Sequence, residues 1–238
     1  AIRRQRQMCI RDRKMILPSF WGSTGIMLVV GAVLYTVFLL FSGATLMQGA
    51  LCLWLFLEMI VNWNAMSYLT AIKDYKSILY SFVAAVLVAF VTSCVLLALA
   101  CPPVESLLFA VVLGYGVMLV WDVLLLHRYF PQSRKHPWLF LQWVDQFLPL
   151  ALTGLLTTIG LFAHLVITWC GPLGIKVKGL FYGAPYYDVP AMLAFLTILI
   201  TTVNFVVSVE VNFYPTYRSY YSLLNDGGTV KDLSLIHI

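Results

Sequence analysis

Long apolar stretches alternate with short polar connections along the chain, and this pattern predicts a bundle of membrane-spanning helices. An α-helix needs about 20 residues to cross the hydrocarbon core of a bilayer, and most of the stretches reach that length. Each stretch is continuously apolar, whereas the strands of a transmembrane β-barrel alternate apolar and polar positions. We therefore predict an all-α polytopic membrane protein with about six transmembrane helices, at residues 25–42, 49–68, 78–100, 107–126, 143–169 and 190–211.

The composition supports a membrane protein and excludes several classes of soluble protein. Hydrophobic residues make up 61% of the 238 residues, charged residues make up 11%, and the mean hydropathy is +0.90. A soluble domain is about 45–50% apolar and about 25% charged, so a soluble enzyme and a disordered segment are both excluded. The sequence has no catalytic Ser/His/Asp grouping, no phosphate-binding glycine loop and no Cys/His metal spacing. We therefore expect neither an enzyme nor a cofactor.

The two ends of the chain carry a pattern that points to sequencing adapters rather than to protein. Residues 8–13 read MCIRDR and residues 233–238 read LSLIHI. Their back-translations, ATGTGTATAAGAGACAG and CTGTCTCTTATACACAT, are reverse complements of each other and resemble a transposase mosaic-end adapter. We therefore predict that residues 1–13 and 233–238 derive from an adapter, and that the remainder is an interior piece of a larger membrane protein.

Most of the net positive charge of the chain lies in residues 1–13. Residues 1–13 hold five of the fifteen basic residues and one of the ten acidic residues. The ten basic and nine acidic residues that remain nearly balance. The overall charge of +5 therefore indicates neither a nucleic-acid-binding arm nor a transit peptide.

Basic residues are concentrated in alternate connections, which predicts the orientation of the helices. Eight lie on one side, before the first stretch and after the second, fourth and sixth, and two lie in the connection after the fifth. Short loops rich in Lys and Arg stay in the cytoplasm, so we expect both ends of the chain to be cytoplasmic. The eight are Lys14, Lys73, Lys76, Arg128, Arg134, Lys135, Arg218 and Lys231, and the two are Lys176 and Lys178.

Polar side chains within the apolar stretches are costly in lipid, so each is a candidate functional residue. Glu58 lies near the middle of the second stretch, with Asn62 one turn later on the same helix face. Either Glu58 lines a polar pathway and binds a cation, a proton or sugar hydroxyls, or it is a structural acid bonded to a neighbouring helix. The candidates for a substrate path are Glu58, Asn62, Asn64, Asn204 and His164. His164 equally fits hydrogen-bonded packing, and Asn204 a contact between helices.

A second group of charged residues falls near the predicted cytoplasmic ends of the apolar stretches. A carboxylate at such a position can reach water or a nearby Arg, and a long basic side chain can extend to the membrane interface. We interpret these residues as charged anchors at the cytoplasmic side: Asp122, Arg128, Asp145, Glu210 and Arg218.

Three segments at the predicted cytoplasmic side resemble the PelG family of exopolysaccharide exporters. They are NWNAMSYLTAIKDYKSILYSF (residues 62–82), GYGVMLVWDVLLLHRYFPQS (114–133) and EVNFYPTYRSYYSLLNDGGTVKDL (210–233). The resemblance extends through residues 14–232 and implies part of a MATE-like flippase bundle with two six-helix lobes. It implies four transmembrane helices of the first lobe at 14–126, a cytoplasmic inter-lobe linker at 127–142, and two helices of the second lobe plus a cytoplasmic helix at 143–232.

The resemblance implies a function but carries over no substrate-contact residue. It implies an exporter of an amino-sugar-rich polysaccharide in the cytoplasmic (inner) membrane of a bacterium. The expected partners are membrane lipid, the polysaccharide chain, a cytoplasmic glycosyltransferase and membrane scaffold proteins, with no nucleic acid. Two alternatives stay open: a flippase for a lipid-linked oligosaccharide or a small molecule, and a non-transporting scaffold for a polysaccharide synthase.

Overall fold

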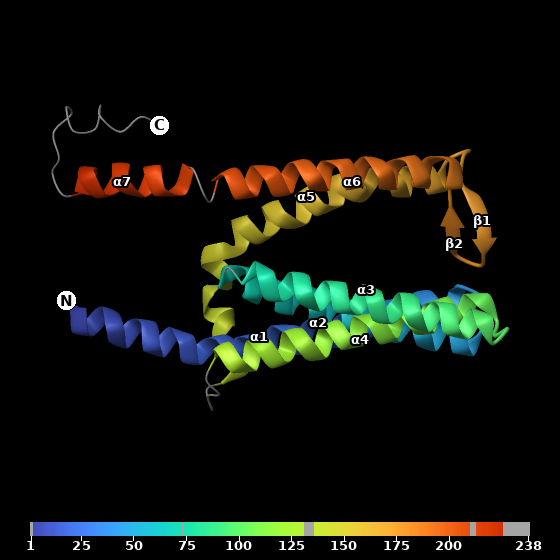
Figure 1. Cartoon of the computed structure of the whole chain (residues 1–238), viewed down its shortest axis with the longest axis horizontal. Helices are drawn as coiled ribbons and strands as arrows, with labels where there is room; N and C mark the ends of the chain where they lie inside the picture. The colour runs from blue at the N-terminus through green and yellow to red at the C-terminus, as the bar shows by residue number, and fades with distance from the viewer. Residues whose placement is uncertain (1, 73, 131–135, 210–212, 226–238) are drawn as a thin grey trace. The chain divides into compact units, whose positions relative to one another are not determined.

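The computed structural model describes residues 2–72, 74–130, 136–209 and 213–225, and these residues are helical almost throughout (Figure 1). The chain divides into two compact units, Ala1–Leu161 with Lys176–Phe181, and Phe162–Ile175 with Tyr182–Ile238. The elements are α1 (Ile2–Phe41), α2 (Leu46–Ala71), α3 (Tyr75–Ala98), α4 (Pro103–Tyr129), the 3-10 helix η1 (Pro137–Trp143), α5 (Val144–Cys170), β1 (Ile175–Lys178), β2 (Phe181–Gly183), α6 (Pro185–Ser208) and α7 (Tyr214–Asn225).

Five helical segments among the described residues are long and apolar enough to cross a membrane, which confirms an all-α polytopic fold. They are Lys14–Phe41, Leu46–Ala71, Tyr75–Ala98, Pro103–Tyr129 and Val144–Cys170. The sixth predicted stretch corresponds to α6, several of whose side chains lie outside the described residues. The first helix begins at Ile2, well before the predicted boundary at residue 25. Ser23 and Thr24 lie within it and accept hydrogen bonds from Asn64 of α2.

Within the first unit, α2 and α4 lie side by side and run parallel. The Gln48 side chain donates a 2.8 Å hydrogen bond to Glu105 near the start of both helices. A buried apolar cluster fills the other end, where α1, α2 and α4 meet. Its members are Leu17, Phe20, Val61, Ala65, Leu69, Leu126 and Phe130.

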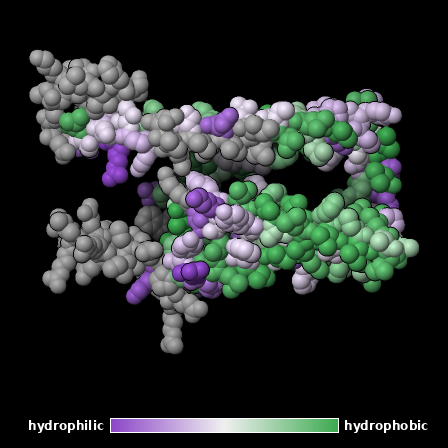
Figure 2. Space-filling view, viewed as in Figure 1, coloured by the Kyte–Doolittle hydropathy of each residue, from purple (hydrophilic) through white to green (hydrophobic). Residues whose placement is uncertain are grey.

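The outer surface of this helix bundle is apolar over much of its length. Large side chains such as Val29, Leu87 and Phe90 are exposed. Figure 2 shows hydrophobic residues gathered over these helices, with hydrophilic residues gathered near the end where α3 begins and α4 ends. An exposed apolar surface of this extent suits contact with lipid, since water-facing surfaces expose only small apolar patches.

The contact between α3 and α4 is close because α4 presents small residues to α3. A Cβ atom at Gly114 would lie 2.6 Å from the backbone oxygen of Ala85 and 2.9 Å from the Ala89 methyl group. The buried residues of α4 recur every four positions, which is the spacing of a packing ridge. They are Ser106, Ala110, Gly114, Met118, Asp122 and Leu126.

Side-chain hydrogen bonds fix the ends of two helices. Thr45 and Gln48 form a capping box at the start of α2. Asp74 caps α3 by accepting a 3.3 Å hydrogen bond from the Ser77 backbone N–H, and the Tyr129 hydroxyl donates a 2.6 Å bond to the same carboxylate. These bonds tie the start of α3 to the end of α4.

The region predicted as an inter-lobe linker, residues 127–142, is partly helical. The end of α4 continues to Tyr129, and η1 begins at Pro137, while residues 131–135 lie outside the described residues. η1 packs against α1, where a Cβ atom at Gly22 would collide with the carbonyl oxygen of Pro137. Its role as a link between two lobes stays a prediction.

The second unit contains the join between α5 and α6. The Trp169 Nε1–H donates a 2.9 Å hydrogen bond to Asp188, which also accepts a 2.8 Å bond from the Ala184 backbone N–H. Because Asp188 caps the helix in this way, α6 begins at Pro185 and not at the predicted residue 190. The helix predicted after α6 is present as α7, and its cytoplasmic location stays a prediction.

The short hairpin of β1 and β2 was not predicted. Its turn contains Gly179, whose φ of +53° is readily adopted only by glycine.

Candidate functional site: a groove between α2 and α4

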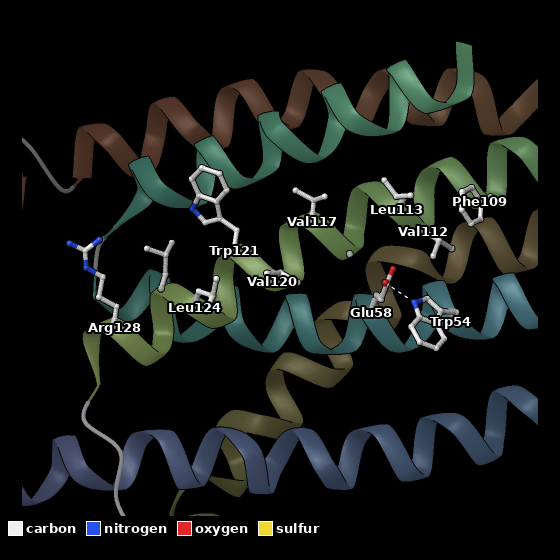
Figure 3. Close-up of a pocket in the computed structure, with 12 residues that line it drawn as sticks. Trp54, Glu58, Phe109, Val112, Leu113, Val117, Val120, Trp121, Leu124 and Arg128 are labelled. Carbon is white, nitrogen blue, oxygen red and sulfur yellow. Dashed lines mark hydrogen bonds between the residues drawn. The ribbon is translucent and has the colours of Figure 1, made fainter. Parts of the chain in front are cut away.

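A groove of about 950 Å³ runs between α2 and α4 (Figure 3). Its walls are mainly apolar, with three aromatic side chains, one carboxylate and one guanidinium group. Along α4 it extends from Phe109 to Arg128, which is about 28 Å at 1.5 Å per residue and close to the thickness of the hydrocarbon core. The lining residues are Trp54, Glu58, Phe109, Val112, Leu113, Gly116, Val117, Val120, Trp121, Leu124, Leu125 and Arg128.

Glu58 is the carboxylate of the groove, and it is held from both helices. The indole Nε1–H of Trp54, one turn earlier on α2, donates a 2.8 Å hydrogen bond to Glu58 Oε1. On the α4 side, a Cβ atom at position 116 would lie 3.1 Å from the same oxygen, so Gly116 lets the carboxylate lie against the α4 backbone. Only 8% of Glu58 is exposed, and its second oxygen, Oε2, has no hydrogen-bond partner among the described residues.

Asn62 continues the same face of α2 toward α4 but does not line the groove. Its Nδ2–H donates a 3.1 Å hydrogen bond to the backbone oxygen of Tyr115. The residue is 2% exposed, and its Oδ1 accepts no hydrogen bond from the described part of the chain. Trp54, Glu58 and Asn62 thus form a polar row at four-residue intervals along α2, facing α4.

Asn64, the third predicted path residue of α2, lies on a different face. Its Nδ2 donates hydrogen bonds of 2.6 Å to Thr24 Oγ1 and 3.2 Å to Ser23 Oγ of α1. It lines a separate hollow of about 650 Å³ between α1 and α2. The structure therefore does not bring Asn64 into the groove with Glu58, and its amide joins two helices.

His164 and Asn204 lie in the second unit. The His164 ring contacts Tyr187 at 5.9 Å and Phe195 at 5.7 Å between ring centroids, which supports a packing role between α5 and α6. Asn204 is exposed on α6. Glu58 belongs to the first unit, so the structure does not test whether His164 or Asn204 joins it in a path.

The predicted cytoplasmic anchors have different environments. Arg128, Asp145 and Arg218 are exposed, as the prediction requires, and Glu210 lies outside the described residues. Asp122 was expected to reach water or Arg128, and this prediction is wrong, because Asp122 is 0% exposed. It belongs to the buried ridge of α4 and not to the membrane interface.

Two residues of the site were not predicted from the sequence. Trp54 was not predicted as the hydrogen-bond donor to Glu58, although its position four residues earlier on a helix places both side chains on one face. Gly116 was missed because its importance depends on the contact between α2 and α4, which the local sequence does not encode.

A metal centre has no support in the described part of the chain. No group of three or more His, Cys, Asp or Glu side chains there could hold a metal ion. The four described cysteines, Cys52, Cys94, Cys101 and Cys170, are free thiols. The expectation of no cofactor therefore stays a prediction.

Five helices long and apolar enough to cross a membrane define a polytopic helical membrane protein. The chain belongs to the PelG family, described as "Putative exopolysaccharide Exporter (EPS-E)", whose family model matches residues 7–237. This membership gives the chain a role in membrane transport and exopolysaccharide export. The matched range includes parts of both segments that the sequence analysis attributes to adapters, so that attribution stays a prediction. Comparisons with curated proteins and with solved structures gave no match.

Proposed function

We propose that the chain forms part of an inner-membrane exporter that carries an amino-sugar-rich polysaccharide along the groove between α2 and α4. The observation that carries the proposal is Glu58, a carboxylate held near the middle of a membrane-spanning helix with one oxygen unpartnered among the described residues. In this proposal the polymer is made by a separate cytoplasmic glycosyltransferase, so the chain itself performs no catalysis.

The groove offers what a sugar chain needs in order to leave water. A buried hydroxyl without a hydrogen-bond partner costs about 1–3 kcal/mol, so a sugar chain cannot cross bare hydrocarbon. The ring faces of Trp54, Phe109 and Trp121 provide flat apolar surfaces on which pyranose rings can stack. Few charged groups line the groove, which suits a polymer that has to slide rather than remain bound.

Glu58 gives the groove a preference for positive charge. Its Oε1 accepts from Trp54, and its Oε2 is buried without a hydrogen-bond partner among the described residues. A turn of the side chain toward the groove would let Oε2 accept an N–H from a protonated amino sugar. Such a charge-assisted hydrogen bond is about twice as strong as a neutral one. The preference is therefore for a polymer that is at least partly deacetylated.

We also propose that the end of the bundle where α3 begins and α4 ends faces the cytoplasm. Lys76 and Arg128 lie at this end, where the Tyr129–Asp74 hydrogen bond joins the start of α3 to the end of α4. The concentration of basic residues in cytoplasmic loops supports this orientation. Arg128 would then lie at the entry of the groove, nearest the glycosyltransferase that supplies the polymer.

The test is polymer secretion by cells that depend on the exporter containing this chain. Glu58→Gln keeps the shape of the side chain and an acceptor for Trp54 but removes the charge. Loss of one charge-assisted hydrogen bond predicts about tenfold less secreted polymer at equal membrane abundance. Trp121→Ala should also reduce secretion, because it removes a stacking surface of the groove.

Trp63→Ala is the matched control for Trp121→Ala. Trp63 is likewise an exposed tryptophan, but it lies on α2 and lines the hollow beside α1 instead of the groove. Trp63→Ala should leave secretion unchanged. Normal secretion by both groove variants would overturn the proposed path and favour a scaffold for the polysaccharide synthase.

A further inference from the structure

Asp122 is a carboxyl group inside the bundle that the proposed path does not use. It lies on the buried ridge of α4, and it is 0% exposed. Neither carboxyl oxygen has a hydrogen-bond partner among the described residues. A fully buried carboxylate without a partner is strongly disfavoured, so the protonation state of this group needs an explanation.

The polar neighbour of Asp122 is Ser81 of α3, which is also 0% exposed. The Ser81 hydroxyl already donates its hydrogen to the backbone oxygen of Ile78, at 3.0 Å. In this arrangement the Ser81 oxygen offers lone pairs to Asp122, whereas a turn of the hydroxyl away from Ile78 would let it donate. A protonated Asp122 can donate its O–H to Ser81 while the Ser81–Ile78 bond stays in place, whereas an ionised Asp122 gains a bond from Ser81 only if that hydroxyl leaves Ile78.

The charged and titratable groups on the elements around Asp122 do not neutralise it. Lys76 on α3 and Arg128 on α4 are exposed. No charged or titratable group on α2, α3 or α4 bonds the Asp122 carboxyl, since neither of its oxygens accepts a hydrogen bond within the described part of the chain. The titratable and charged groups described on this half of the bundle are Glu58 and Tyr68 on α2, Asp74, Tyr75, Lys76 and Tyr80 at the start of α3, and His127, Arg128 and Tyr129 at the end of α4.

We propose that Asp122 and Ser81 form a proton-binding site between α3 and α4. One proton binds reversibly to the carboxylate, and the resulting acid donates its O–H to Ser81. The protonated form permits the close contact in which Gly114 lies against the Ala85 backbone. Loss of the proton places an uncompensated charge in that contact and favours separation of the two helices, because separation admits water to the carboxylate.

The consequence for transport rests on the proposed function. Helix α4 forms one wall of the groove and packs against α3. If the polymer passes along this groove, then separation of α3 from α4 leaves α4 free to shift. Binding and release of a proton at Asp122 would then alter the width of the groove. The proton site itself does not depend on polymer transport and can be tested without it.

The test is infrared spectroscopy of the exporter that contains this chain, reconstituted in phosphatidylcholine vesicles and titrated from acid to alkaline pH. A protonated carboxylic acid has a carbonyl stretch that is distinct from the bands of a carboxylate. We expect this band at neutral pH, and we expect Asp122→Asn to remove the intensity of one carboxyl group per chain. Asp145→Asn, at an exposed site of α5, should leave the neutral-pH band unchanged.

Two further variants separate the site from general structural effects. Among the described residues, Glu58 is the other buried acid. A carbonyl band that persists in Glu58→Gln therefore does not come from Glu58. Ser81→Ala leaves the Asp122 carboxyl in place but removes its acceptor, and it should shift the Asp122 band to higher frequency. A neutral-pH spectrum that Asp122→Asn leaves unchanged would overturn the proposal, because Asp122 would then be ionised and hydrated.

The outcomes for transport are distinguishable from these. An Asp122 band together with normal secretion by the Glu58 and Trp121 variants would overturn the proposed path and keep the proton site. Reduced secretion by those variants without an Asp122 band would keep the path and overturn the proton site.

Discussion

The indole nitrogen of Trp54 donates its hydrogen to the Glu58 carboxylate across 2.8 Å, one turn along α2. The bond fixes the direction of a carboxyl group that lies against the α4 backbone at Gly116, and the other carboxyl oxygen is buried without a hydrogen-bond partner among the described residues. One helix therefore supplies both the acid and the group that orients it, while the neighbouring helix supplies the space. The predictions below separate these contributions.

Trp54→Phe should remove the hydrogen bond that orients Glu58 while it keeps an aromatic surface at this position. The variant loses the N–H donor, and a hydrogen bond to a charged group contributes about 1.5–3 kcal/mol. A double-mutant cycle with Glu58→Ala, which removes the acceptor, measured in detergent by thermal unfolding, should give a coupling energy of about 1 kcal/mol or more. Additive effects of the two substitutions would show that the bond does not contribute to stability.

Gly116→Ala should reduce export more than it reduces stability. The added methyl group would lie 3.1 Å from Glu58 Oε1, and the carboxylate has to move away to accommodate it. The matched control is Gly25→Ala in α1, where an added Cβ meets no atom within 4 Å. That control should stabilise the helix by about 0.5–1 kcal/mol and leave secretion unchanged. Equal secretion by the two alanine variants would remove Gly116 from the site.

The helices could be predicted from the sequence, but most contacts between them could not. Long apolar stretches define spans such as Leu46–Ala71, because lipid imposes a minimum length on them. The approach of Gly116 to Glu58 depends on how α2 is aligned with α4, and no local pattern encodes that alignment.

Two errors had signals in the sequence that were not used. Asp122 was predicted to lie at the interface because it is near the end of its stretch, yet Ser106, Ala110 and Gly114 precede it at four-residue spacing and mark a buried face. The hairpin has an alternating IKVK segment before a glycine at its turn. The side-chain period of a strand is two residues, so that segment is typical of a strand.

Gly114→Ala should destabilise the bundle strongly, because the added methyl group meets backbone instead of a movable side chain. It would lie 2.6 Å from the Ala85 oxygen, so α3 and α4 have to separate. Overpacking of this kind costs about 1–3 kcal/mol. The thermal unfolding temperature in detergent should fall. Adding Ala89→Gly to Gly114→Ala should not restore it, because the closest clash is with the Ala85 backbone. A neutral effect of Gly114→Ala would contradict the close contact of the two helices.

The start of α3 should loosen under acid conditions. Hydrogen bonds from Ser77 and then from Tyr129 lower the pKa of Asp74 below its ordinary value of 3.8. A carboxyl group whose pKa is lowered in the folded protein stabilises it above the unfolded pKa, and this contribution is lost as the pH falls through the folded pKa. Tyr129→Phe should raise the pKa of Asp74 toward its ordinary value, which carbon NMR of labelled aspartate can measure. An unchanged titration in this variant would show that the Tyr129 bond is absent in the membrane.

Asn64→Ala should distinguish a residue that joins helices from one that contacts the polymer. Asn64 was predicted to line the path, but its Nδ2 bonds Thr24 and Ser23 of α1, and it lies outside the groove of Glu58. Removing the amide leaves the buried Thr24 hydroxyl without this partner, which costs about 1–3 kcal/mol of stability. The secretion per folded exporter should therefore stay normal while the unfolding temperature in detergent falls, whereas Glu58→Gln should show the reverse. If Asn64→Ala instead lowers secretion at unchanged stability, then the polymer contacts the α1 side of α2, and the path runs through the hollow between α1 and α2.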